Sequence, residues 1–354
     1  MYDKDPLTAM QAVTTAQWLA FAPLAFQATA VMRDRGLLAS LERSGKDGRS
    51  IEEVALETKM SVYAARVLLE AALGLQIAWR SEGKFFLGKL GRFLLNDEMT
   101  RINFEFTQHV CYGAAASLAE SLQEGRPAGL KTLGPWPTLY EGLSVMPEPA
   151  LSAWHAFDHF YSDRAFPQVC DRLAADPPRR LMDIGCNTGK WAQACLSRFP
   201  DLHVSLVDLA PQLARAKARL EALQLLERAQ LHPANMLDAD SVLPANCDMV
   251  WMSQFLDCFS EDQIVSILRK VRASLSPGAR VWILELFWDR QRFEAAALSL
   301  QQTSLYFTCV ANGNSQMYDS GVFLSLVAKA GFEVTASTDG IGGYHTLLEC
   351  RPAS

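Results

Sequence analysis

The sequence has little excess charge, no clustered cysteines and no long apolar run. Its formal net charge over 354 residues is −6, so no general attraction to nucleic-acid phosphates or anionic lipids is expected. The longest apolar stretches, such as residues 18–26, are about half as long as a membrane span. The eight cysteines lie far apart without a C-x-x-C pair, which predicts reduced thiols rather than disulfides or a zinc site.

Two further absences concern metals and export. No carboxylate cluster has metal-ligand spacing, and the first residues carry no basic run of the kind that begins a secretory signal. We therefore expect a cytoplasmic protein that binds no metal, no membrane and no nucleic acid.

What is present is an apolar chain long enough for several domains. Hydrophobic residues make up 49% of it, enough for a large core, and the length predicts two or three domains. The pattern changes twice, which divides the chain into residues 1–100, 101–165 and 166–354. The middle region combines helices with a connector rich in glycine and proline, and ends in a helix predicted over residues 151–166.

The first region is mainly helical and ends in a hairpin. Ser50 is placed to cap a helix over 51–58, a second helix follows over 62–75, and two short strands form a hairpin over 77–87. This order is that of a winged helix, which serves either DNA binding or dimerisation. The second helix offers only Arg66 for contact with DNA, and the first helix carries three glutamates. Dimerisation is therefore the favoured role.

The third region alternates strands and helices. Apolar strands separated by amphipathic helices predict a mostly parallel sheet that is covered on both faces, and the last two strands are predicted to be an antiparallel pair. The predicted strands cover residues 180–184, 203–208, 229–232, 249–252, 280–284, 332–335 and 344–350.

A glycine loop follows the first of these strands. In Asp183-Ile184-Gly185-Cys186-Asn187-Thr188-Gly189, backbone NH groups and a helix N-terminus face a ligand at the strand's carboxyl end. Asn187 stands where the dinucleotide fingerprint needs glycine, and Asp183 would repel a pyrophosphate but attract an ammonium or sulfonium group. Asp208 ends the next strand, where a carboxylate accepts both ribose hydroxyls.

This loop, with Asp208 after it, resembles the cofactor loop of class I S-adenosylmethionine-dependent methyltransferases. More narrowly, the chain is similar to small-molecule O-methyltransferases that carry an N-terminal winged-helix dimerisation domain. The resemblance implies a homodimer and an α/β fold with a Rossmann-like, seven-stranded, mostly parallel sheet whose last strand is antiparallel. Cofactor contacts are implied for a further set of residues, Asn235, Met236, Ser253 and Tyr161, beside Asp183, Gly185, Gly189 and Asp208.

One departure from the family concerns the general base. After the fourth strand the family has a histidine, and this chain has Asp257. A buried carboxylate can act as base if its pKa is raised, but Asp257 can equally bind the acceptor or cap the next helix. His109, His159 and Glu285 are the alternative bases, and each has a plain interpretation as a satisfied polar group of the core.

The acceptor pocket is predicted from family position. We expect Trp288 and Tyr306 to form aromatic walls for a flat ring and Asn312 to make a polar contact. A stripe of aromatic residues is, however, also typical of a protein core.

The resulting hypothesis is transfer of a methyl group from S-adenosylmethionine to a small aromatic, phenolic or polyketide-like acceptor in secondary metabolism. O-methylation is favoured. C-methylation of a phenol ring, a non-catalytic cofactor-binding scaffold or sensor, and a winged-helix regulator remain as alternatives.

Overall fold

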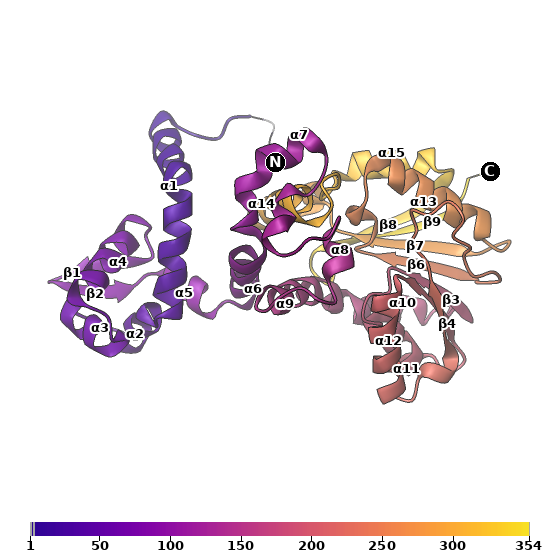
Figure 1. Ribbon diagram of the computed structural model, residues 1–354, viewed down its shortest axis with the longest axis horizontal. Helices are drawn as coiled ribbons and strands as arrows, with labels where there is room; N and C mark the ends of the chain where they lie inside the picture. The colour runs from indigo at the N-terminus through magenta and orange to yellow at the C-terminus, as the bar shows by residue number, and fades with distance from the viewer. Residues whose placement is uncertain (1, 3, 354) are drawn as a thin grey trace. The chain divides into compact units, whose positions relative to one another are not determined.

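A computed structural model describes residue 2 and residues 4–353. The chain divides into two compact units, one ending at Gln108 and one beginning at His109, which are described separately (Figure 1).

The first unit is mainly helical and contains one hairpin. Its elements are α1 (Ala9–Asp34), α2 (Leu37–Ser44), α3 (Ile51–Thr58), α4 (Val62–Gly74), β1 (Ala78–Ser81), β2 (Lys84–Leu87), α5 (Lys89–Asn96) and α6 (Glu98–Phe106). The cap predicted at Ser50 is present, since its hydroxyl accepts from the NH of Glu53 at 3.2 Å and the Glu53 carboxylate bonds back to the NH of Ser50. Residues from Met32 to Leu87 form the apolar core of this unit.

Helix α1 keeps many apolar side chains on its surface. A helix with apolar residues on most sides is usually covered by other protein. Within the first unit, only Thr29, Ala30 and Met32 of this helix are buried. Its exposed large apolar residues are Met10, Val13, Trp18, Leu19, Phe21, Leu24 and Val31.

The second unit begins with short helical segments. These are a π-helical turn (Thr107–Cys111) that spans the boundary, two 3-10 turns (Ala114–Ser117 and Ala128–Thr132), α7 (Leu118–Glu124), α8 (Leu139–Gly142), α9 (Ala150–Ser162) and α10 (Phe166–Leu173). The single helix predicted over residues 151–166 is interrupted, because α9 ends at Ser162 and a 3-10 turn over 163–165 leads into α10. Pro167 lies in the first turn of α10, where its missing NH costs nothing.

The predicted seven-stranded sheet is the centre of this unit. Its strands are β3 (Arg180–Ile184), β4 (His203–Asp208), β5 (Ala229–Pro233), β6 (Met249–Ser253), β7 (Arg280–Glu285), β8 (Phe332–Ile341) and β9 (His345–Pro352). They lie in the order β5-β4-β3-β6-β7-β9-β8, and only β9 runs antiparallel to its neighbours. The mostly parallel sheet with an antiparallel last strand is therefore confirmed.

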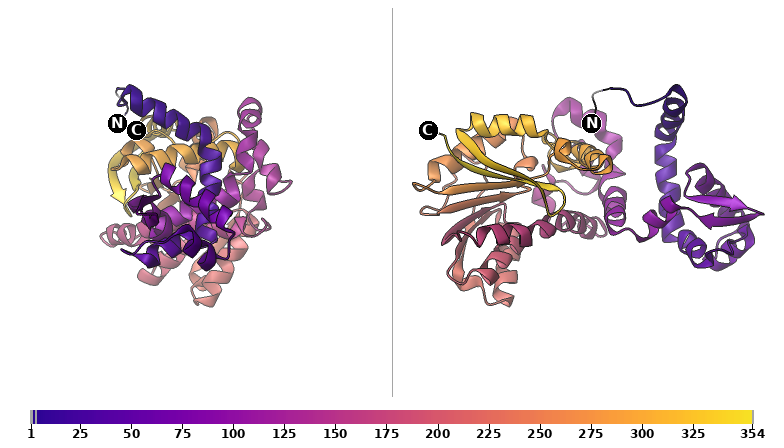
Figure 2. Two further views of the ribbon diagram at one scale, coloured as in Figure 1. Left: turned by 90° about the vertical axis from the view of Figure 1, so that its left-hand side faces the viewer. Right: turned by 180° about the vertical axis from the view of Figure 1, so that it is seen from behind.

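Helices cover both faces of this sheet (Figure 2). One face packs against α10, α11 (Lys190–Arg198) and α12 (Ala210–Ala222), and the other against α13 (Glu261–Ser274) and α15 (Ser320–Lys329). Because the chain turns to opposite sides after β3 and β6, a crevice opens at the carboxyl ends of these neighbouring strands. The remaining helix, α14 (Glu294–Tyr306), continues into a π-helical turn over Phe307–Ala311.

No helix in the described part of the chain is long and apolar enough to cross a membrane. All eight cysteines are free thiols.

Candidate functional site

A cavity of about 340 Å³ opens at the carboxyl ends of β3, β4 and β6. Its wall combines the glycine loop, the ends of these strands, α8, α9, the turn after β6 and the loop around residue 312. The cavity therefore lies at the switch point of the sheet, where α/β folds bind ligands.

The glycine loop brings its backbone close to the cavity. Gly185 has φ +76°, and a Cβ atom there would lie 2.3 Å from the ring of Phe255, so only glycine fits. Gly189 is also left-handed and donates its NH to the carbonyl of Cys186 at 2.9 Å. Asn187 adopts φ +46°, a conformation that asparagine tolerates better than most residues.

Asp183 lies at the floor of this loop without a full set of partners. Its side chain is buried and lines the cavity, and its Oδ2 atom has no hydrogen-bond partner in the described chain. Burial, followed by the negative charge of Asp208, raises the pKa of this carboxyl well above its usual range. An unpaired buried carboxyl is costly unless a ligand supplies the partner, and an ammonium group fits this position.

Asp208 is held by the backbone at the end of β4. Its Oδ2 accepts from the NH of Asn187 at 2.8 Å, and its Oδ1 accepts from the NH of Leu209 at 2.7 Å. Burial raises the pKa of Asp208 to about 6, partly opposed by these two bonds. Each oxygen keeps one further lone pair, so the carboxylate can accept two neighbouring hydroxyls.

Beyond the glycine loop and Asp208, the cavity is bordered by residues at the ends of β5 and β6. Asn235, Met236 and Ser253 all line it. Asn235 is fixed by accepting from the NH of Leu237 at 3.1 Å, whereas the hydroxyl of Ser253 is buried without a partner in the described chain. Ser253 therefore has a donor and an acceptor left for a ligand.

Asp257 lies behind the cavity wall. It is 4% exposed, it is not among the residues that line the cavity, and its Oδ1 accepts from the thiol of Cys258 at 3.4 Å. Burial raises its pKa to about 7. The cap of α13 is Ser260 rather than Asp257, because the Ser260 hydroxyl accepts from the NH of Gln263. Cys258 and Phe259, not Asp257, face the cavity.

Glu285 supports the same turn from beneath. Its Oε1 accepts from the NH groups of Phe255 and Leu256 at 3.1 and 2.9 Å, and its Oε2 is buried without a partner in the described chain. Burial, followed by the charge of Asp257, raises the pKa of Glu285 well above its usual range. This carboxyl fixes the turn and does not reach the cavity wall.

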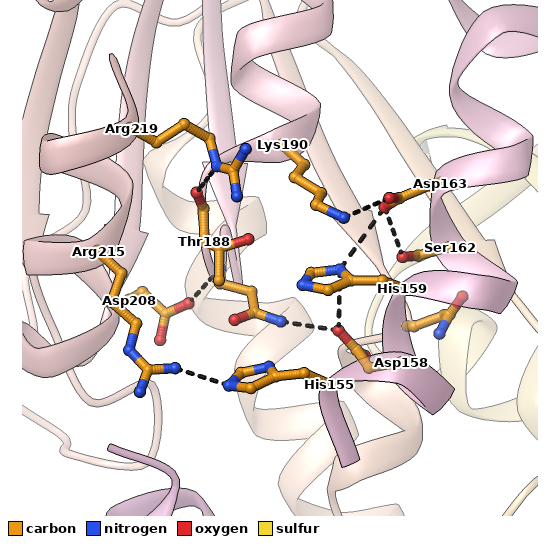
Figure 3. Close-up of polar contacts among 12 residues, drawn as sticks. His155, Asp158, His159, Ser162, Asp163, Thr188, Lys190, Asp208, Arg215 and Arg219 are labelled. Atoms are coloured by element: carbon orange, nitrogen blue, oxygen red, sulfur yellow. Dashed lines mark hydrogen bonds and ion pairs between the residues drawn. The ribbon is translucent and has the colours of Figure 1, made fainter. Parts of the chain in front are cut away.

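A network of charged side chains from α9, the 3-10 turn after it and α11 forms another part of the wall (Figure 3). Asp158 accepts from the amide of Asn187 at 2.9 Å, and the Nδ1 atom of His159 lies 3.7 Å from Asp158 and 3.6 Å from Asp163. Lys190 pairs with Asp163 at 2.5 Å. Burial raises the pKa of Asp163, but the bonds from His159 and Lys190 outweigh it and hold the pKa below the usual value.

Of the other residues predicted for the site, one lines the cavity and four do not. Asn312 lines the cavity, and its amide donates to the carbonyl of Cys258 at 2.5 Å. Tyr306 is buried outside the wall, but its hydroxyl accepts from the indole of Trp154, which lines the cavity, at 2.7 Å. His109, Tyr161 and Trp288 are not among the lining residues.

Asp158 and Lys190 line the cavity although neither was predicted as a site residue, and Asn187, predicted only as part of the glycine loop, lines it too. Asn187 and Lys190 belong to the glycine loop and to the first turn of the helix after it, which is the position that faces a ligand. Asp158 and Ser162 are four residues apart on α9 and line the same wall, a spacing that places them on one helix face. The described residues contain no group of three or more metal-ligating side chains placed to hold a metal ion.

Two family models match the chain. A Dimerisation2-like domain matches residues 13–85, and an O-methyltransferase domain matches residues 167–333.

Curated relatives match parts of the chain. A 3-amino-4-hydroxybenzoate 4-O-methyltransferase from Streptomyces cremeus is 26% identical over 64% of this chain and 59% of its own length. An aclacinomycin 10-hydroxylase from Streptomyces purpurascens is 29% identical over 49% of this chain and 44% of its own length. The chain thus spans about half the length of the curated relatives it matches.

Solved structures match over nearly the whole length. The apo form of an S-adenosylmethionine-dependent methyltransferase, SibL, has a TM-score of 0.71 and 24% identity, over 96% of this chain and 99% of that one. An O-methyltransferase from neocarzinostatin biosynthesis, solved with S-adenosylmethionine and 2-hydroxy-5-methyl naphthoic acid, has a TM-score of 0.63 and 20% identity, over 98% and 100%. These similarities show the fold.

Proposed function

We propose that this chain, which belongs to the S-adenosylmethionine-dependent O-methyltransferases with an N-terminal dimerisation domain, methylates a hydroxyl of a small aromatic, phenolic or polyketide-like acceptor. The observation that carries the proposal is the cavity. Its wall includes Asp183 and Asp208, which fit an ammonium group and a ribose, and continues over α9 and the loop of Asn312, where we place the acceptor. Relatives that act on aromatic acceptors support this class of substrate.

The residues of the cofactor half have separate tasks in this proposal. The Asp183 carboxyl, together with the loop backbone at Gly185, receives the ammonium end of the cofactor, and Asp208 accepts the ribose hydroxyls. Asn235, Met236 and Ser253 border the adenine. The bound cofactor supplies an activated methyl group on a sulfonium, so that positioning by the protein provides much of the rate.

Labelled methyl transfer tests the activity. We expect that the protein, incubated with methyl-labelled S-adenosylmethionine and a panel of phenolic acids, places the label in a methoxy group, as read from product mass and proton spectrum. Label attached to a ring carbon would favour C-methylation. Cofactor binding without any labelled product would favour a scaffold or sensor. Because one relative is a hydroxylase, the product mass must also be inspected for added oxygen.

We further propose a homodimer formed through a winged-helix first unit. The exposed apolar residues of α1, among them Trp18, Phe21 and Leu24, support a second copy as its cover, since a helix so apolar is unfavourable in water. Trp18→Glu combined with Leu24→Glu should yield a monomer by light scattering. An unchanged mass would contradict this interface. We also propose that the enzyme is cytoplasmic and acts in secondary metabolism.

A further inference from the structure

We propose that Asp158 is the carboxylate that contacts the acceptor hydroxyl and takes up its proton during methyl transfer. This inference rests on the proposed function and assigns the base within it. The family's histidine position holds Asp257, which lies behind the wall of the cavity, whereas Asp158 forms part of that wall.

The position of Asp158 links the two halves of the cavity. It lies within α9, and its Oδ2 atom accepts from the side-chain amide of Asn187 in the glycine loop. A cofactor seated on this loop therefore lies next to Asp158. Asn187 fixes the carboxylate as a positioning residue, and His159 beside the same oxygen adds a second constraint.

One oxygen of this carboxylate is left for a ligand. The contacts of Asp158 with Asn187 and His159 are both made by Oδ2, and the described residues offer no partner to Oδ1. The side chain is 21% exposed and lines the cavity, so it is accessible to a molecule bound there. A carboxylate oxygen accepts a hydroxyl proton well in such a site.

The other carboxylates of the cavity wall have different surroundings. Asp183 and Asp208 belong to the cofactor half, Asp163 is paired with Lys190, and Glu141 is exposed on α8. Of the carboxylates on the described wall, Asp158 combines burial, a fixed orientation and an available oxygen.

The charges around Asp158 suit a base. His159 and Asp163 face it from its own helix and the next turn, Lys190 from α11, and Asp257 from the turn after β6. Burial raises the pKa of Asp158, and the charge of Asp163 adds to this, while His159, Lys190 and the Asn187 bond oppose it. A carboxyl with a raised pKa accepts a proton more readily than an exposed one.

The step is balanced in atoms and charge. The acceptor O–H bond breaks and its proton moves to Oδ1 of Asp158, while the acceptor oxygen forms a bond to the methyl carbon. The bond between this carbon and the cofactor sulfur breaks, and its electron pair stays on sulfur. A neutral phenol, a sulfonium and a carboxylate thus become a methyl ether, a thioether and a carboxylic acid, which later loses its proton to solvent.

The test compares acceptors that need a base with acceptors that do not. The probes are catechol and 4-nitrocatechol at pH 8, where the nitro compound is already ionised, with wild type, Asp158→Asn and the surface control Glu333→Gln. We expect Asp158→Asn to lower kcat/KM for catechol by about 10²–10⁴-fold, the usual contribution of general base catalysis, but to change that for 4-nitrocatechol by less than about tenfold. Equal losses for both acceptors, or no loss, would overturn the assignment.

A second readout needs no turnover. The visible absorbance of 4-nitrocatechol bound to the S-adenosylhomocysteine complex reports how much of the probe is ionised. At a pH near the pKa of the probe, where only part of it is ionised, removing the negative charge of Asp158 should increase the ionised fraction, and an unchanged spectrum would refute the contact. Circular dichroism and cofactor affinity verify that the variant is folded. If wild type neither binds nor methylates any phenol, the proposed function itself fails, which is a different result from an active wild type with an unaffected Asp158→Asn.

Discussion

Replacing Asp208 by alanine should weaken cofactor binding by a predictable amount. The carboxylate is held by two backbone NH groups, of Asn187 and Leu209, and its remaining lone pairs are placed for two ribose hydroxyls. A hydrogen bond to a charged group contributes about 1.5–3 kcal/mol. Because water replaces part of what is lost in Asp208→Ala, we take one such bond as the net loss, so that Kd rises about 10- to 150-fold.

Calorimetric titration with S-adenosylhomocysteine measures this change directly. Glu227→Ala is the matched control, since it removes the same charge from an exposed position and should leave Kd unchanged. The pKa of about 6 for Asp208 adds a pH test. The ionised form accepts the ribose, so protonation of Asp208 should weaken binding as the pH falls through about 6, and the loss of affinity on acidification should be smaller in Asp208→Ala, in which only Asp183 of this pair is left to titrate. An unchanged Kd, or the same acid limb in both proteins, would refute the ribose assignment.

Three further substitutions test the roles of Asp183, Asp257 and Ser50. Asp183→Asn should weaken cofactor binding at least about tenfold while the melting temperature of the cofactor-free protein at pH 8 stays equal or rises, because an unpaired buried carboxyl is removed; a fall in melting temperature would contradict this. Asp257→Asn should lower kcat/KM for catechol by less than about tenfold, and a loss as large as that of Asp158→Asn would restore Asp257 as the base. Ser50→Ala should destabilise the first unit by about 1 kcal/mol in denaturant unfolding without altering cofactor affinity, and unchanged stability would deny the cap its role.

The sheet, and the placement of the glycine loop and Asp208 at its carboxyl edge, could be predicted because local sequence determines them. The bounds of two strands, Arg180–Ile184 and His203–Asp208, agree with the prediction. This is because buried parallel strands appear in a sequence as short apolar runs between glycine and charged residues. The glycine loop and Asp208 follow these strands directly, so their placement at the cavity came with the sheet.

The acceptor half depends on contacts between distant segments, which a sequence pattern does not contain. Asn187 meets Asp158 across 29 positions, and the turn that hides Asp257 is held by Glu285 from another strand. Whether a carboxylate faces the cavity or lies behind its wall follows from this packing. Position in the chain pointed to Asp257, and the three-dimensional arrangement points to Asp158.

The break between α9 and α10 illustrates the same limit. Residues 163–165 form a tighter turn where helical periodicity predicted continuity, and this turn places Asp163 between His159 and Lys190. The contacts of Asp163 with His159 and Lys190 stabilise this interruption. The helix propensity of a single segment does not include such contacts.

Isothermal titration of the folded protein with S-adenosylmethionine measures whether the cavity binds this cofactor. We expect heat and saturation at one cofactor per chain, with binding strongly weakened in Asp183→Asn and Asp208→Ala. A folded wild-type protein that gives no heat and no saturation across the titration would contradict the assignment of the cavity to this cofactor.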